Sequence, residues 1–126
     1  AMQILGTEVR DLPTLLLGIS LLGPKITCIT DGHNGAYMRY SDQNYFLPIY
    51  PDPLPPLERT GAGDAFASTF AAAIVSGVDP VEAFRWGPIN SMNVVQYVGA
   101  QKGLLKRKDL GNLLNSAPAD YVVKKI

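Results

Sequence analysis

The sequence predicts an α/β fold that contains one core strand, a β-hairpin and a set of packed helices. A β-branched run of strand length at 25–30 is typical of a buried parallel strand. Two further segments, 36–40 and 45–49, are separated by turn residues and indicate a hairpin. Helical patterns dominate after residue 64. We therefore expect a sheet with a mainly parallel core strand, covered by helices.

Length and composition favour a single partial or complete domain over residues 1–126. The chain has 126 residues, 47% of them hydrophobic, and 11 basic side chains balance 11 acidic ones. This balance gives no basic field for nucleic acid and no polybasic membrane signal. The single cysteine, Cys28, excludes an internal disulfide and suits the cytoplasm. Ala1 before Met2 reads as a vector scar, and no signal peptide is expected.

The N-terminal third predicts a helix, a strand and a turn in that order. Apolar residues recur at three- and four-residue spacings over 12–22, which indicates an amphipathic helix entered through Asp11 and closed by Gly23. After the strand at 25–30, the segment 31–35 has the composition of a tight turn.

The C-terminal half predicts three helices and a final strand. A small-residue helix is expected over 65–77, and its alanines favour close packing. Asp79 followed by a proline predicts the start of a helix that runs through 81–97. A short helix is expected over 106–114, and 119–126 ends in an edge strand guarded by lysines.

The strongest chemical signal is a glycine-rich turn that follows a stiff loop with four prolines between residues 50 and 57. In Thr60–Asp64 the glycines allow successive backbone N–H groups to converge on an anion before a helix N-terminus. Asp64 could then accept a proton from a hydroxyl that attacks a phosphate. The alternative is that these glycines form only a tight turn and that Asp64 is only a first-turn carboxylate.

Three segments in order resemble the PfkB (ribokinase-like) family of carbohydrate and nucleoside kinases. Residues 58–66 are similar to its second signature, Asp-Thr-x-Gly-Ala-Gly-Asp-x-Phe, with departures at Glu58 and Arg59. Residues 30–36 are similar to its Thr-x-Gly-x-x-Gly nucleotide turn, and 99–103 resemble its Gly-Ala-x-x-Gly loop. The resemblance runs from about residue 12 to residue 114.

The resemblance implies a role for each matching residue. Asp64 would be the general base, and Gly61, Ala62 and Gly63 would form the anion hole. Glu58 would stand at the position of a family acid linked to a monovalent-cation loop, with the charge kept and the side chain lengthened. ATP and Mg²⁺ are the implied cofactors, with a monovalent cation as a further one. The residues expected at the nucleotide are Thr30, Gly32, Gly35, Asn90, Gly99, Ala100 and Gly103.

The resemblance also implies that a large part of the family fold lies outside this sequence. Family members are more than twice as long, and the missing portion would be N-terminal: the lid, the sugar-binding strands and a magnesium-associated Asn-x-x-Glu motif. We therefore expect the C-terminal, ATP-side half of a ribokinase-like three-layer α/β/α sandwich. Surfaces exposed by such a truncation predict a homo-oligomer.

The expected function is ATP-dependent phosphorylation of a sugar or nucleoside hydroxyl, inactive in this isolated chain because transfer needs a lid that excludes water. The alternative is a non-catalytic nucleotide-binding or interaction module that retains the kinase fold. A Rossmann oxidoreductase is not favoured, because no Gly-x-Gly-x-x-Gly follows a first strand.

Three other side chains and one basic cluster each have a structural and a functional interpretation. Cys28 is expected to be buried rather than reactive. His33 is expected in an exposed turn rather than on a phosphate, and Trp86 in the core rather than beside adenine. The basic cluster around Lys106 is expected to be a solvated helix start rather than a nucleotide attractor.

Overall fold

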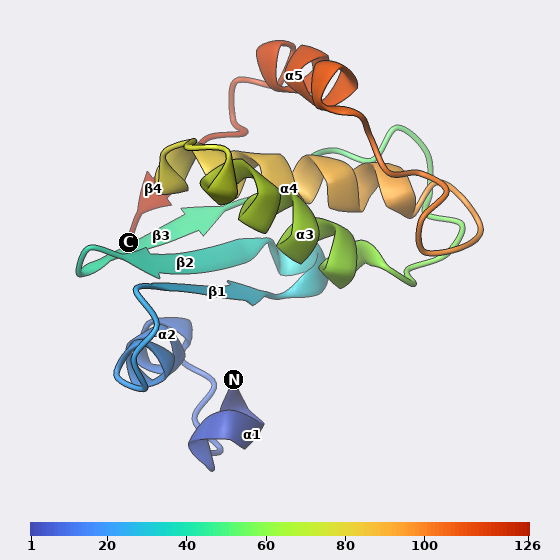
Figure 1. The fold of residues 1–126 in the computed structure, drawn as a ribbon. Coiled ribbons are helices and arrows are strands. Elements are labelled where there is room, and N and C mark those ends of the chain that lie inside the picture. The colour runs from blue at the N-terminus through green and yellow to red at the C-terminus, as the bar shows by residue number, and fades with distance from the viewer. The chain divides into compact units, whose positions relative to one another are not determined.

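The computed structural model describes residues 1–126 and divides into two compact units. The first unit comprises Ala1–Pro48 with Val123–Ile126, and the second comprises Ile49–Val122 (Figure 1). No helix combines the length and the apolar character that crossing a lipid bilayer would require. Along the chain, two helices are followed by three strands, three helices and a last short strand, so the chain mixes helices and strands as the predicted α/β class requires.

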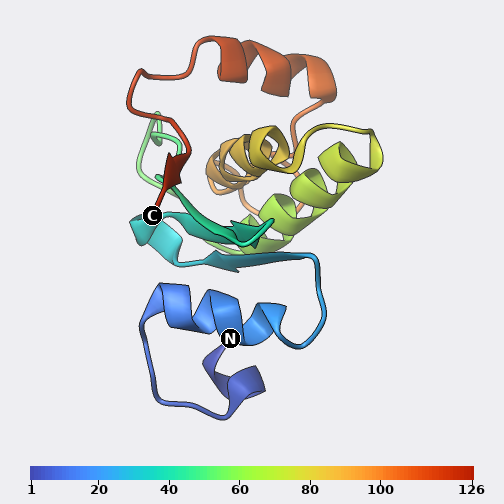
Figure 2. The same ribbon diagram turned by 90° about the vertical axis from the view of Figure 1, so that its left-hand side faces the viewer.

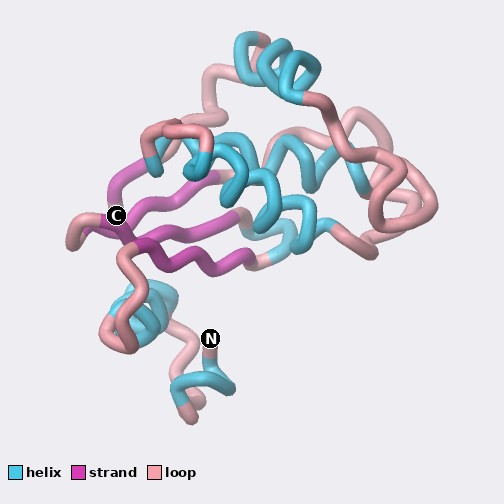
Figure 3. Tube along the Cα trace, in the orientation of Figure 1, coloured by secondary structure: helices cyan, strands magenta, loops and turns pink.

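The first unit contains a four-stranded sheet in the order β1-β2-β3-β4 (Figure 3). Its strands are β1 (Ile26–Thr30), β2 (Ala36–Tyr40), β3 (Gln43–Leu47) and β4 (Lys124–Lys125). The hairpin is thus confirmed, although its second strand begins and ends two residues earlier than expected. The lysine-rich C-terminal edge strand is confirmed as well.

The prediction of a mainly parallel core strand is wrong, because all three strand pairs are antiparallel. β1 and β2 are joined by a short turn that includes the 3₁₀ helix η1 (Gly32–Asn34). A parallel return would need a crossover of about a dozen residues or more, which this turn does not supply. The β-branched composition of β1 indicated a strand correctly but carried no information on its direction.

Two helices precede the sheet in the first unit. The helix α1 (Met2–Leu5) was not predicted, whereas α2 (Leu12–Ser20) matches the expected amphipathic helix. α2 begins at Asp11, whose carboxylate accepts a hydrogen bond from the Thr14 backbone N–H at 3.0 Å. α2 packs against β1 and β2, and its Leu15 and Leu16 are buried (Figure 2).

The second unit consists of α3 (Ala62–Val75), α4 (Pro80–Val94) and α5 (Arg107–Asn115), all close to their predicted ranges. α4 begins as predicted, because the Asp79 carboxylate accepts a hydrogen bond from the Val81 N–H at 2.9 Å. α3 and α4 pack along each other through the rings of Phe66 and Phe84, which meet edge to face at 6.1 Å. The close approach of α3 and α4 requires glycine at position 87, because a Cβ there would lie 2.5 Å from the Phe66 ring.

The C-terminal part of the second unit packs against the rest of that unit through Tyr121. The Tyr121 ring is buried, meets the Tyr50 ring edge to face at 5.0 Å, and its hydroxyl donates to the Arg85 carbonyl at 2.6 Å. Trp86 is half-buried rather than a core residue, and the Arg107 guanidinium lies over its ring at 5.8 Å. The basic start of α5 therefore packs on α4 through a cation–π contact.

Candidate active site

The glycine-rich turn ends at the N-terminus of α3, where the chain changes from loop to helix. Gly61 is the N-cap residue and has φ +85°, a left-handed conformation that glycine adopts without steric cost. Ala62, Gly63 and Asp64 form the first turn, and the N–H groups of Gly63 and Asp64 make no hydrogen bond within the chain. Free N–H groups and the partial positive charge of a helix N-terminus together favour an anion.

Asp64 lies in the first turn of α3, beside these free N–H groups. Its side chain is exposed and takes part in no ion pair or hydrogen bond with another side chain. Gly63 is exposed too, and a Cβ added to it would meet no atom within 4 Å. The turn therefore combines an exposed proton acceptor with two backbone N–H donors that have no partner in the chain.

The turn touches the loop at 99–103, which the sequence places almost forty residues further along. A Cβ on Gly61 would lie 2.8 Å from both the Cα and the Cβ of Ala100, and 2.9 Å from its carbonyl oxygen. Only glycine permits this approach, because real Cβ atoms essentially never come so close to backbone. The structure thus brings together two of the three predicted motif segments.

Glu58 makes a second connection between the same two segments. One carboxylate oxygen, Oε2, accepts a hydrogen bond from the Gly99 N–H at 3.1 Å. The Thr60 hydroxyl and the Gly99 N–H both hold the pKa of Glu58 below its usual range, since each hydrogen bond favours the charged form. The carboxylate is therefore ionised at neutral pH and is engaged by donors of the chain itself.

Two polar side chains of α4, Asn90 and Asn93, bind backbone groups in and just after the 99–103 loop. The Asn90 amide is buried, donates to the Thr69 hydroxyl at 2.7 Å, and accepts from the Leu105 N–H at 2.9 Å. Asn93 donates to the Gly103 carbonyl at 2.6 Å. Asn90, which was expected at the nucleotide, therefore satisfies local polar groups of the chain. Gly103 is packed as closely as Gly61, because a Cβ on it would lie 2.6 Å from the Asn93 carbonyl oxygen.

Ser91 is a site residue that the sequence analysis missed. Its hydroxyl donates to the Ala62 carbonyl at 2.7 Å and so ties α4 to the first turn of α3. The available signal was the group of polar residues at 90, 91 and 93 within the otherwise apolar segment 86–94 of α4. That signal shows polar partners are needed but does not say which backbone groups they bind.

The third motif segment, Thr30–Ala36, lies in the first unit and forms the turn between β1 and β2. Thr30 and Gly32 are exposed, and Gly32 has φ +54°. Gly35 has φ +99°, and a Cβ there would lie 2.5 Å from the Leu47 carbonyl oxygen, so this glycine is required by the packing of the hairpin. His33 is exposed in the same turn, as expected.

The described residues contain no preformed metal centre. No three side chains among His, Cys, Asp and Glu lie close enough together to hold a metal ion. Mg²⁺ at phosphoryl-transfer sites is usually held by one or two carboxylates together with the substrate's phosphates, so Mg²⁺ would enter as its complex with ATP. Glu58, the residue implied for a monovalent cation, is instead engaged by hydrogen-bond donors of the chain.

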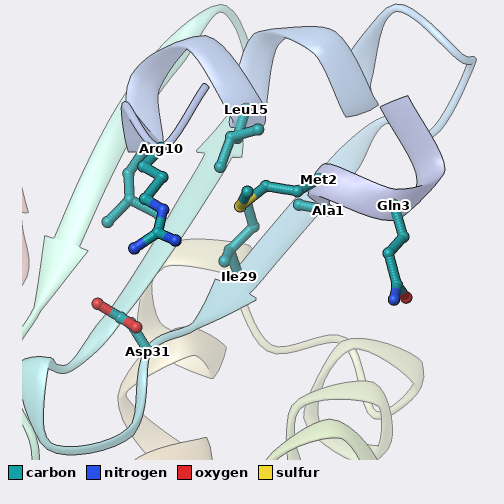
Figure 4. Close-up of a pocket in the computed structure, with 8 residues that line it drawn as sticks. Ala1, Met2, Gln3, Arg10, Leu15, Ile29 and Asp31 are labelled. Atoms are coloured by element: carbon teal, nitrogen blue, oxygen red, sulfur yellow. The ribbon is translucent and has the colours of Figure 1, made fainter. Parts of the chain in front are cut away.

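One open cavity of about 530 Å³ lies in the first unit. Arg10 and Asp31 extend toward the same space from above and below, and Leu15, Met2 and Ile29 lie to one side of them (Figure 4). None of the predicted site residues lines this cavity.

Comparison with known proteins connects the chain to one family. Residues 3–107 match the family model described as pfkB family carbohydrate kinase. A curated ribokinase from Bacillus subtilis is 32% identical over 104 residues, which are 82% of this chain and 35% of the ribokinase. The chain therefore spans about a third of the length of this relative.

Solved structures agree with this match. The ribokinase of Arabidopsis thaliana complexed with ribose and ATP superposes with a TM-score of 0.78 at 25% identity, over 90% of this chain and 37% of that one. A ribokinase II from E. coli in complex with ATP and Mg²⁺ superposes with a TM-score of 0.79 at 19% identity, over 91% of this chain and 37% of that one. The structure is therefore a part of the ribokinase-like fold with mixed helices and strands.

Proposed function

This chain belongs to the pfkB family of carbohydrate kinases, and from that premise we propose that the protein transfers a phosphoryl group from ATP to a hydroxyl of a sugar or nucleoside. The observation that supports this most directly is the first turn of α3, where the exposed Asp64 carboxylate adjoins the free N–H groups of Gly63 and Asp64. A base beside an anion site is what transfer to a hydroxyl requires.

In the proposed reaction Asp64 accepts the proton of the acceptor hydroxyl as its oxygen attacks the terminal phosphorus of ATP. The new O–P bond forms as the bond from that phosphorus to the bridging oxygen breaks, and ADP carries the electron pair away. The turn formed by Gly61, Ala62 and Gly63 would stabilise the negative charge that develops on the transferring group through the free N–H groups of Gly63 and Asp64, whereas the Ala62 N–H donates to the Arg59 carbonyl at 3.4 Å. Mg²⁺ bound with ATP would neutralise phosphate charge.

The nucleotide would lie against the loop at 99–103, which contacts the turn at Gly61. Gly99 and Ala100 offer backbone without large side chains there, whereas Gly103, included by resemblance, is buried and its carbonyl accepts from Asn93. We include Thr30, Gly32 and Gly35 of the first unit in the nucleotide site by resemblance, and Asn90 as the residue that supports the loop through Leu105. In the whole protein the chain would form the ATP-side part of a three-layer α/β/α sandwich.

The chain spans 35% of the B. subtilis ribokinase and 37% of the two solved structures, and this coverage favours a restricted activity. We propose that the 126-residue chain alone binds nucleotide weakly and shows negligible turnover, because nothing in it covers the acceptor and excludes water. The second candidate function is a non-catalytic nucleotide-binding module, and the same partial coverage of the relatives' length favours it.

Nucleotide binding is tested first by thermal unfolding of the chain with and without ATP and Mg²⁺. Gly63→Val places a branched side chain in the open space before the N–H groups, and we expect it to abolish the nucleotide-dependent rise in Tm. Gly111→Val is the matched control, because Gly111 is also helical and a Cβ there also meets no atom within 4 Å. A rise in Tm that is equal in both variants would contradict an anion site at Gly63.

Catalysis is tested by co-expressing the chain with the complementary N-terminal part of a ribokinase such as that of B. subtilis. If the two parts assemble, we expect ribose-dependent formation of ADP, and we expect Asp64→Asn to lower it by about 10²–10⁴-fold while nucleotide binding persists. Turnover that survives this substitution would remove Asp64 from the role of base. Nucleotide binding by an assembled complex without any turnover would favour the non-catalytic module.

A further inference from the structure

The Glu58 carboxylate lies between two loops that come from distant parts of the second unit. Its backbone is anchored at the end of α4, because the N–H groups of Leu57 and Glu58 both donate to the Val95 carbonyl, at 2.9 and 3.3 Å. From this fixed position the side chain reaches the Gly99 N–H, to which Oε2 lies at 3.1 Å. The side chain thus joins a held segment to the beginning of the loop at 99–103.

The loop beyond Gly99 has few other connections at its start. Gly99 is exposed and has φ +99°, so the chain reverses there in a left-handed conformation. The next residue, Ala100, lies against Gly61, where the approach is too close for any Cβ. At the far end the loop is held separately, since Asn93 binds the Gly103 carbonyl. The Glu58 hydrogen bond is therefore the side-chain link that fixes Gly99 and, through it, Ala100.

We propose that Glu58 is a positioning residue that holds the 99–103 loop against the glycine-rich turn by its hydrogen bond to the Gly99 N–H, without the help of a monovalent cation. The arrangement differs from the cation ligand that the resemblance implied, because the carboxylate accepts hydrogen bonds from the chain and is not part of any group of three side chains that could hold a metal ion. The longer arm of glutamate, compared with aspartate, provides the reach to the backbone of the loop. The consequence for nucleotide binding rests on the function proposed above.

Amide hydrogen exchange at Gly99 tests the proposal directly, since it needs neither nucleotide nor turnover. We expect Glu58→Ala to speed exchange at Gly99 by about five- to tenfold, the effect of losing one ordinary hydrogen bond at a solvent-exposed position. Glu58→Gln keeps a side-chain acceptor at the same reach and should restore most of the protection, whereas Glu58→Asp should not. Glu82→Ala is the matched control, because it removes an exposed carboxylate of α4 that pairs only with Arg85.

The same measurement in two salts separates a hydrogen bond from a bound cation. We expect the wild-type Gly99 exchange rate to be the same within twofold in potassium chloride and in tetramethylammonium chloride at equal ionic strength. Protection that appears only with potassium, or that Glu58→Gln abolishes as fully as Glu58→Ala does, would overturn the proposal. So would a Gly99 exchange rate that Glu58→Ala leaves unchanged.

Nucleotide binding supplies a second and separate readout. We expect Glu58→Ala to reduce the ATP-dependent rise in Tm and Glu58→Gln to restore it. A wild-type chain that binds no ATP but shows the expected Gly99 exchange pattern would contradict the proposed function and leave the positioning role intact. ATP binding that Glu58→Ala does not weaken would contradict the functional consequence of the positioning role.

Discussion

Replacing Gly61 with alanine would strain the glycine-rich turn in two ways that can be measured separately. The residue has φ +85°, and a left-handed conformation costs an L-residue with a Cβ about 1–2 kcal/mol. The added methyl group would also lie 2.8 Å from the Cα of Ala100 and 2.9 Å from its carbonyl oxygen. Backbone must move to relieve such contacts, and overpacking of this kind typically costs about 1–3 kcal/mol. We therefore expect Gly61→Ala to lower the free energy of unfolding by about 2–5 kcal/mol.

Urea unfolding followed by circular dichroism measures this loss, and two other glycines provide the controls. Gly77 has φ +82° but open space around its Cβ position, so Gly77→Ala should show the conformational cost alone, about 1–2 kcal/mol. Gly63 has neither a positive φ nor a close neighbour, so Gly63→Ala should change stability little. The difference between Gly61→Ala and Gly77→Ala isolates the contact with Ala100. If Gly61→Ala is no more destabilising than Gly77→Ala, the close packing of the two motif segments is refuted.

Three further predictions concern other parts of the chain. Tyr121→Phe should lower the free energy of unfolding in urea by about 0.5–1.5 kcal/mol, because it removes the 2.6 Å hydrogen bond to the Arg85 carbonyl; an unchanged midpoint would contradict that bond. Burial raises the pKa of the Cys28 thiol to about 12, so Ellman's reagent at pH 8.5 should label the folded chain slowly and the denatured chain rapidly. Because the folded chain keeps this proton to higher pH, stability should fall as the pH rises above the ordinary thiol pKa of about 8.5, and Cys28→Ala should remove that fall. Finally, Leu21 and Leu22 are exposed at the end of α2, and β1 pairs with another strand on one side only. Light scattering should therefore show self-association of the chain, and the double substitution Leu21→Ser, Leu22→Ser should reduce it. A wild-type chain that stays monomeric at high concentration would contradict this prediction.

Local chemistry allowed most elements to be predicted from the sequence. The start of α4 follows from Asp79 and Pro80, since a carboxylate that caps two N–H groups and a proline in the first turn act within a few residues. The hairpin follows from alternating residues around a turn, and the N-terminus of α3 from the glycines before it. α1 was missed because four residues are too short to show a helical period.

The candidate site was predictable as a set of residues but not as a set of contacts. The composition of Thr60–Asp64 fits an anion-binding turn as well as a plain tight turn, and the family match favours the first interpretation. The partners of Glu58 and Ser91 were not foreseeable, because each hydrogen bond joins residues that are tens of positions apart. Asn90 shows the same limit, since a polar residue in a helix could equally face a ligand or a backbone group.

The sequence by itself determined where the chain forms helices and turns and which turn carries the candidate chemistry, because caps, glycines and periodicity act between near neighbours. Only the tertiary structure decided the direction of β1, the contact of Gly61 with Ala100 and the hydrogen bond from Gly99 to Glu58. The physical reason is that strand pairing and close packing depend on which distant segments meet, and the free energy of those contacts is a property of both partners together.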